Sequence, residues 1–116
     1  MRNFKINKPY FRFTFIDENY ELPEILTYVY LGQNLDSGDE RLWYFQDVQS
    51  YANGVIYQGN NELLNRDKKT DILPELLVLE EKQLNTFCAI DELITKLSNF
   101  KLGIKLDQWG KYDNKK

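Results

Sequence analysis

The carboxylate side chains are the residues of this chain with the clearest capacity for chemistry. The 116 residues include 18 Asp and Glu but no histidine, which excludes Ser-His-Asp and Cys-His catalysis and every histidine-containing zinc site. Two carboxylates held at the right separation can perform acid–base work such as glycoside hydrolysis. The candidates are Asp17, Glu18, Glu21 and Asp47. They could converge on a cleft, but nothing in the sequence shows that any two of them meet, so no catalytic residue is predicted.

Cysteine and glycine patterns point to no cofactor or metal. Cys88 is the single cysteine and lies between Phe87 and Ala89, so an internal disulfide is excluded and a buried, unreactive thiol is expected. No glycine-rich phosphate-binding loop occurs. Residues 34–39 are similar to a calcium loop, but the glycine comes one place early, and Phe45 occupies the twelfth position, where glutamate is needed.

Charge is distributed unevenly along the chain. Residues 17–47 carry eight acidic residues and one base, whereas residues 1–16 carry four bases and no acid, and the net charge is −3. Such an acidic region attracts a basic protein and repels nucleic acid. Solvated loops with acidic caps are the alternative interpretation. The predicted partner-binding residues are these acids with two aromatic anchors: Asp17, Glu18, Glu21, Glu24, Asp36, Asp39, Glu40, Trp43, Asp47 and Tyr51.

Alternating apolar and polar residues predict the strands that position these side chains. The clearest alternation places Phe11, Phe13 and Phe15 on one side of a strand. Short connections between the first three predicted strands favour an antiparallel meander. The expected strands cover residues 10–16, 25–31 (closed by Gly32), 42–46, 55–57 as a short edge strand, 76–79, and 104–109.

Capping residues and helical spacing predict the remaining elements. Asp47 is a predicted N-cap and Gly54 a predicted C-cap of a short helix, which would return Tyr51 over the strand end. Apolar residues three or four apart predict a helix over residues 90–99. A further helical turn at 81–86, a loop or brief helix at 65–71 and a polar tail at 111–116 complete the assignment.

These elements together predict an α+β fold, with an antiparallel sheet of about four to five strands and one or two helices packed on one face. A single globular domain is expected over residues 1–110, followed by the polar C-terminal tail at 111–116. No apolar run is long enough to span a membrane, and the N-terminus lacks a small-residue cleavage site. The single cysteine suits a reducing compartment, so a cytoplasmic location is expected.

Two segments resemble small bacterial immunity proteins, which accompany polymorphic toxins. They are Trp43-Tyr44-Phe45-Gln46-Asp47-x-x-Ser50-Tyr51-x-x-Gly54 and Ile90-Asp91-Glu92-Leu93-Ile94-x-x-Leu97. The resemblance implies a cytoplasmic toxin inhibitor that binds a cognate bacterial toxin and blocks its active site. An acidic immunity protein and a basic toxin would associate rapidly, because complementary charges speed encounter.

Two other functions are compatible with the composition. The chain has 8 Tyr, 7 Phe and 2 Trp, and these rings would suit a small enzyme or ligand binder with a carboxylate pair in an aromatic pocket. They would equally suit a structural accessory protein that forms oligomers, including a homodimer. The protein-binding, non-enzymatic function is the one predicted.

Overall fold

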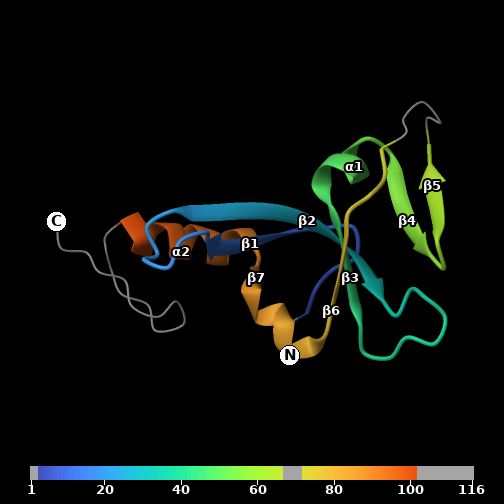
Figure 1. The fold of residues 1–116 in the computed structure, drawn as a ribbon, viewed down its shortest axis with the longest axis horizontal. Helices are drawn as coiled ribbons and strands as arrows, with labels where there is room; N and C mark the ends of the chain where they lie inside the picture. Colours follow the sequence, from blue (N-terminus) through green and yellow to red (C-terminus); the bar gives the residue numbers. More distant parts are fainter. Residues whose placement is uncertain (1–2, 67–71, 102–116) are drawn as a thin grey trace. The chain divides into compact units, whose positions relative to one another are not determined.

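The structure is a computed structural model that describes residues 3–66 and 72–101. The described residues form seven strands, two α-helices and one 3-10 helix (Figure 1), which confirms the predicted α+β class. The strands are β1 (Pro9–Phe15), β2 (Pro23–Gln33), β3 (Trp43–Asp47), β4 (Val55–Gly59), β5 (Glu62–Asn65), β6 (Leu76–Leu79) and β7 (Phe87–Cys88). The helices are α1 (Val48–Ala52), the 3-10 helix η1 (Glu81–Thr86) and α2 (Ile90–Lys101).

Five strands form a sheet in the order β6-β3-β2-β1-β7, and β4 and β5 form a separate two-stranded sheet. The β2–β3, β3–β6 and β1–β7 pairs are antiparallel, as predicted for the main sheet. Val55–Tyr57 is a strand as expected, but β4 pairs with β5, an element that sequence analysis missed. The predicted strand at 104–109, the tail at 111–116 and part of the 65–71 loop lie outside the described residues.

The described residues divide into two compact units. Unit 1 contains residues 3–10, 27–66 and 72–85, and unit 2 contains residues 11–26 and 86–101. Strands β1 and β2 each contribute residues to both units.

Unit 1 buries aromatic side chains on both faces of its strands. On one face, the Phe4 ring meets Phe45 edge to face, with 5.3 Å between ring centroids, and Tyr30 packs against both. On the other, Leu31 packs with Tyr44. Because both faces are covered, residues 28–31 of β2 are buried without alternation.

Strand β2 ends later than predicted and contains a β-bulge. Gly32 was expected to close the strand, but β2 continues to Gln33 and the register with β3 shifts between Tyr30 and Gly32. Gly32 has φ 135°, a conformation that glycine adopts without steric cost.

The corner between β3 and α1 has the predicted cap. The Asp47 carboxylate accepts hydrogen bonds from the Ser50 N–H at 2.8 Å and from the Ser50 hydroxyl at 2.6 Å. Gly54 has φ 88° just after the helix, which fits the left-handed position beyond a helix end. The predicted cap is confirmed, although the helix is a single turn of five residues.

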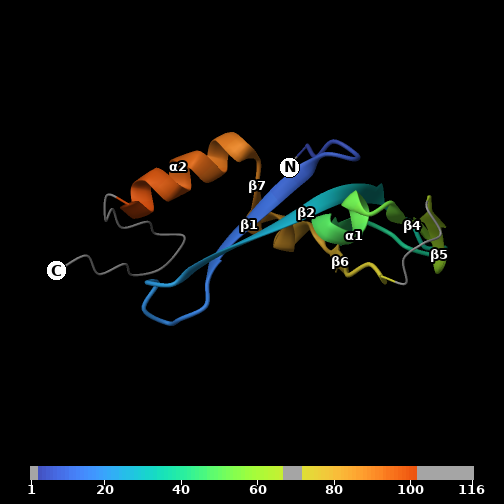
Figure 2. The same ribbon diagram turned by 90° about the horizontal axis from the view of Figure 1, so that it is seen from above.

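Unit 2 packs α2 against strand residues (Figure 2). Leu93 on α2 lies in a buried cluster with Phe13 of β1 and Cys88 of β7, and Leu97 and Phe100 pack against it. The predicted helix is confirmed and extends two residues further, to Lys101. The Cys88 thiol is buried, as expected from its apolar neighbours.

Candidate functional site

The ten predicted partner-binding residues are shared between the two units. Four lie in or beside the β1–β2 loop of unit 2, and six lie in unit 1. The four in unit 2 are Asp17, Glu18, Glu21 and Glu24, and the six in unit 1 are Asp36, Asp39, Glu40, Trp43, Asp47 and Tyr51.

Asp17 shapes the β1–β2 loop from within. Its carboxylate accepts hydrogen bonds from the Leu22 N–H at 2.8 Å and the Glu21 N–H at 3.1 Å. Partial desolvation opposes ionisation, but these N–H groups outweigh it, so the pKa of Asp17 lies below its ordinary value of 3.8. Tyr20, with φ 57°, turns its ring edge-on to Phe15. The loop is therefore held by contacts within unit 2.

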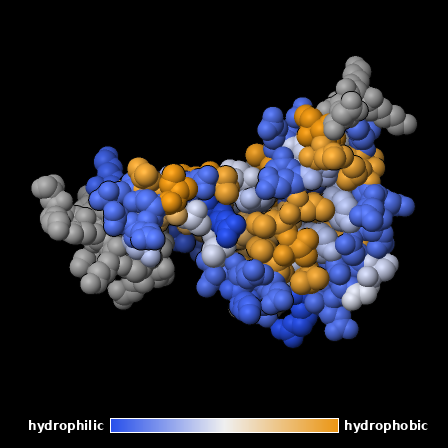
Figure 3. Space-filling view, in the orientation of Figure 1, coloured by the Kyte–Doolittle hydropathy of each residue, from blue (hydrophilic) through white to orange (hydrophobic). Residues whose placement is uncertain are grey.

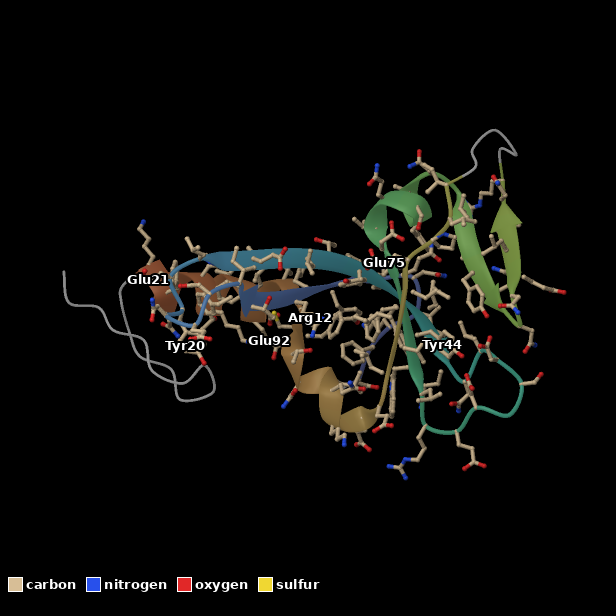
Figure 4. All side chains as sticks on the ribbon, viewed as in Figure 1. Arg12, Tyr20, Glu21, Tyr44, Glu75 and Glu92 are labelled. Atoms are coloured by element: carbon tan, nitrogen blue, oxygen red, sulfur yellow. The ribbon has the colours of Figure 1, made fainter. Side chains whose placement is uncertain are left out.

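The other three acids of this loop are exposed. Figure 4 shows Tyr20 and Glu21 leaving adjacent positions of the loop in different directions. Glu18, Glu21 and Glu24 are all exposed to solvent. Residues 16–25 contain four carboxylates and no basic residue, so this end of the hairpin carries concentrated negative charge.

Three aliphatic side chains are exposed at the same end of the hairpin. The exposed fractions of Ile16, Leu22 and Ile25 are 67%, 55% and 43%. The Ile16 N–H donates to the Leu22 carbonyl at 3.0 Å, so these two residues face each other across the loop. We call Ile16, Glu18, Glu21, Leu22, Glu24 and Ile25 the hairpin loop surface. The charge pattern predicted its acidic residues but not its aliphatic ones. Ile16 was expected to end the first strand, but β1 stops at Phe15 and leaves Ile16 in the loop.

Asp36 and Asp39 in unit 1 serve as acceptors for buried tyrosines. The Tyr57 hydroxyl donates to Asp36 at 2.5 Å, and the Tyr44 hydroxyl donates to Asp39. The two tyrosine rings stack with planes 9° apart and centroids 6.0 Å apart, and Figure 4 shows Tyr44 extending from β3. The Asn60 N–H also donates to Asp36, at 2.7 Å. These bonds fasten the 34–42 loop to β3 and to the β4–β5 turn.

The pKa of Asp36 has the shift expected of a structural contact. The hydrogen bond from Tyr57, followed by that from Asn60, holds the pKa of Asp36 below its ordinary value. Burial and the bond to Asp39 raise the pKa of Tyr44, and the bond to Asp36 together with desolvation raises the pKa of Tyr57. A general acid needs a raised carboxyl pKa, which Asp36 lacks.

We expect the Tyr57→Phe substitution to loosen this loop and lower the free energy of unfolding by about 1 kcal/mol, because a hydroxyl that donates to Asp36 and accepts from the Asn61 N–H is lost. Urea denaturation followed by circular dichroism measures the change. Tyr51→Phe is the matched control, since the Tyr51 hydroxyl bonds only the exposed Asn7 among the described residues. Equal stability of the two variants would contradict a structural role for the Asp36 contact.

The four remaining predicted residues lie in different environments within unit 1. Trp43 is buried in β3 with 3% of its surface exposed, so its ring belongs to the core of unit 1. Asp47 caps α1 and also accepts from the Glu75 N–H at 2.7 Å; burial opposes its ionisation, but the Ser50 and Glu75 bonds outweigh this and lower the pKa of Asp47. Tyr51 is half-buried, and Glu40 is exposed.

Glu40 borders an open groove in unit 1, which we call the Arg41–Glu81 groove. The groove has a volume of about 530 Å³ and is bridged by the Arg41–Glu81 ion pair at 2.8 Å. Its lining consists of Glu40, Arg41, Leu42, Glu80, Glu81 and Lys82. With three acids and two bases, it is a polar groove of mixed charge with a small acidic excess.

Within residues 3–66 and 72–101, no three His, Cys, Asp or Glu side chains are grouped so that they could hold a metal ion. Neither α-helix that the structure describes has the length and apolar composition needed to cross a membrane. Comparisons with protein-family models, with curated proteins and with solved structures found no match to this chain.

Proposed function

We propose that this protein is a protein-binding domain that captures a basic partner through the hairpin loop surface. The observation that carries the proposal is the exposure of Ile16, Leu22 and Ile25 on a loop whose only charged residues are acidic. Exposed aliphatics grouped with one sign of charge are typical of interaction sites, because the apolar atoms favour burial while the charges select the partner.

The internal bonding of the loop supports binding. Ordering a flexible loop on association costs free energy, and a preorganised loop avoids much of that cost. Asp17 accepts N–H groups from Glu21 and Leu22, and the Tyr20 ring packs on the cluster around Phe13. The three exposed glutamates therefore lie on a loop that is already ordered before a partner binds.

The resemblance to immunity proteins supplies the class of partner. We propose that the partner is a basic bacterial toxin and that the domain acts in the cytoplasm by covering the toxin's active site. Acidic residues at the rim of such an interface accelerate association, and this acceleration weakens as salt screens the charges.

A charge-reversal variant tests this proposal. Glu18→Lys, Glu21→Lys and Glu24→Lys combined should slow association with the captured partner by about tenfold at low salt and remove most of the salt dependence. The partner is first recovered by tagged pull-down at low and high salt, and its association rate is then measured by surface plasmon resonance. These positions are chosen because Asp36 and Asp39, unlike them, hold the fold.

Glu62→Lys, an exposed glutamate on β5 of unit 1, is the matched control and should leave the rate within about twofold of the parent. An unchanged association rate in the triple variant would contradict the hairpin loop surface as the binding site. Failure of the parent to protect cells that express the recovered partner would contradict the toxin assignment alone.

A further inference from the structure

Strand β6 is an edge strand with an apolar surface. It is the terminal strand of the main sheet and pairs with β3 alone among the described strands. Figure 3 shows hydrophobic residues gathered over β6 and bordered by hydrophilic ones. The exposed fraction of Val78 is 40%, and that of Leu73, just before the strand, is 79%. Proteins usually protect such edges because they template pairing with another chain.

The pairing with β3 shows which backbone groups of β6 point outward. The Asp47 N–H donates to the Glu75 carbonyl at 3.0 Å, and the register continues with Phe45 opposite Leu77. In an antiparallel pair, alternate residues direct their N–H and C=O groups to the same neighbour. Leu77 and Leu79 therefore bond to β3, and the backbone groups of Leu76 and Val78 face the open edge.

The row of outward-facing backbone groups on this edge ends on both sides of β6. At one end, Pro74 has no N–H to donate. At the other, the Glu80 N–H donates to the Gln83 side-chain oxygen at 2.8 Å, and the Glu80 carbonyl accepts from the Gln83 N–H at 3.0 Å. The edge is thus a window of two donors and two acceptors, on Leu76 and Val78, which matches a short extended segment.

The charges beside the window select the occupant. Glu75 and Glu80 are exposed at its two ends, and Figure 4 shows Glu75 beside β6. A second copy paired antiparallel through Leu76 and Val78 would bring Glu75 of one copy within one residue of Glu80 of the other, at both ends. Such like-charge juxtaposition is unfavourable. A basic residue at one end of an apolar strand would meet Glu75, and one at the other end would meet Glu80, whose carboxylate lies 3.9 Å from the exposed Lys82 ammonium. The Arg41–Glu81 groove borders the Glu80 end.

We propose that the outer edge of β6 binds an extended segment of a partner protein, with apolar residues in its middle and Lys or Arg at its ends, by adding it as a further strand of the sheet. The hydrogen bonds come from Leu76 and Val78, and the specificity comes from Glu75 and Glu80. This site shares no residue with the hairpin loop surface, so either proposal can fail without the other.

The test uses the full chain and the capped peptide Lys-Val-Thr-Val-Thr-Val-Lys. At saturating peptide, hydrogen exchange measured by NMR should slow by about tenfold or more at the Leu76 and Val78 amides. The Leu77 amide is the internal control and should change little, because it already bonds to β3. The same peptide with glutamate at both ends should bind at least about tenfold more weakly, since its charges would face Glu75 and Glu80.

The Val78→Pro substitution removes one outward N–H, which is tolerated at a strand edge, and should weaken peptide binding about tenfold. Val78→Thr keeps that N–H and should bind as the parent does. Should the proline variant fail to fold, a peptide N-methylated at its central amides tests the same bonds against the parent chain. Binding without protection of Leu76 and Val78, or undiminished binding of the N-methylated peptide, would overturn strand addition. Protection of these amides in a peptide-free dimer would assign the edge to a second copy instead.

Discussion

Replacing Trp43 with alanine should lower the free energy of unfolding by about 3–5 kcal/mol. Only 3% of the surface of Trp43 is exposed, and β3 places this residue between two paired strands, opposite Gln33 of β2 and Leu79 of β6. Truncation to a methyl group leaves a cavity that the paired strands on both sides cannot close. Urea denaturation followed by far-ultraviolet circular dichroism measures the loss without relying on tryptophan fluorescence.

Val48→Ala is the matched control for Trp43→Ala, because Val48 is an exposed apolar residue of the same region and should cost less than about 1 kcal/mol. A Trp43→Ala variant with nearly parental stability and lost partner capture would place the ring at an interface, which is the alternative that the sequence left open.

Replacing Gln46 with leucine should destabilise the protein by about 2–4 kcal/mol. Gln46 is fully buried and joins three elements of unit 1. Its amide nitrogen donates to the Val55 carbonyl at 2.5 Å and to the Ser50 hydroxyl at 2.7 Å, and its oxygen accepts the Tyr57 N–H at 3.0 Å. Leucine fills a similar volume but leaves the buried Val55 and Tyr57 backbone groups without partners, and burying such groups is costly. Chemical denaturation again reports the difference.

Two further variants, one at an exposed glutamine and one at Gln46, separate the loss of hydrogen bonds from a change in packing. Gln49→Leu, at an exposed site on α1, should cost less than about 1 kcal/mol. Gln46→Glu keeps the shape, but its carboxylate cannot donate to Val55, so burial raises the pKa of the new side chain in the folded state. Its stability should be greatest below the unfolded glutamate pKa of about 4.3 and should fall as pH rises through the folded pKa. A pH-independent loss would contradict the donor role of Gln46.

Local patterns identified most of the elements correctly. Three of these patterns are local: the alternating phenylalanines of β1, the cap at Asp47 and the apolar spacing of α2. Each depends on residues that are close together in the sequence, so the sequence alone suffices to predict them. The β4–β5 hairpin was also accessible, since Asn60 and Asn61, with φ 53° and 65°, suit a two-residue hairpin turn. Strand β7 was missed because a two-residue strand is too short to show alternation.

Contacts between distant parts of the chain determine which acidic residues are exposed and which belong to the fold. Charge counting grouped eight acids into one expected surface, but Asp36 meets Tyr57, 21 residues away, and Asp47 meets the Glu75 N–H, 28 residues away. A carboxylate that accepts such bonds is part of the fold. The carboxylates of Glu18, Glu21 and Glu24 remain exposed beside aliphatic side chains, which a count of charges cannot detect.

The sequence by itself determined the α+β class, the positions of the longer strands and helices, the absence of histidine chemistry and the acidic character of residues 17–47, because each of these follows from composition or from local periodicity. Only the tertiary structure decided that Trp43 lies in the core, that Asp36 and Asp39 bind tyrosines, and that β6 is left at the edge of the sheet. Burial and strand order depend on which distant segments pair, and no local pattern specifies that choice.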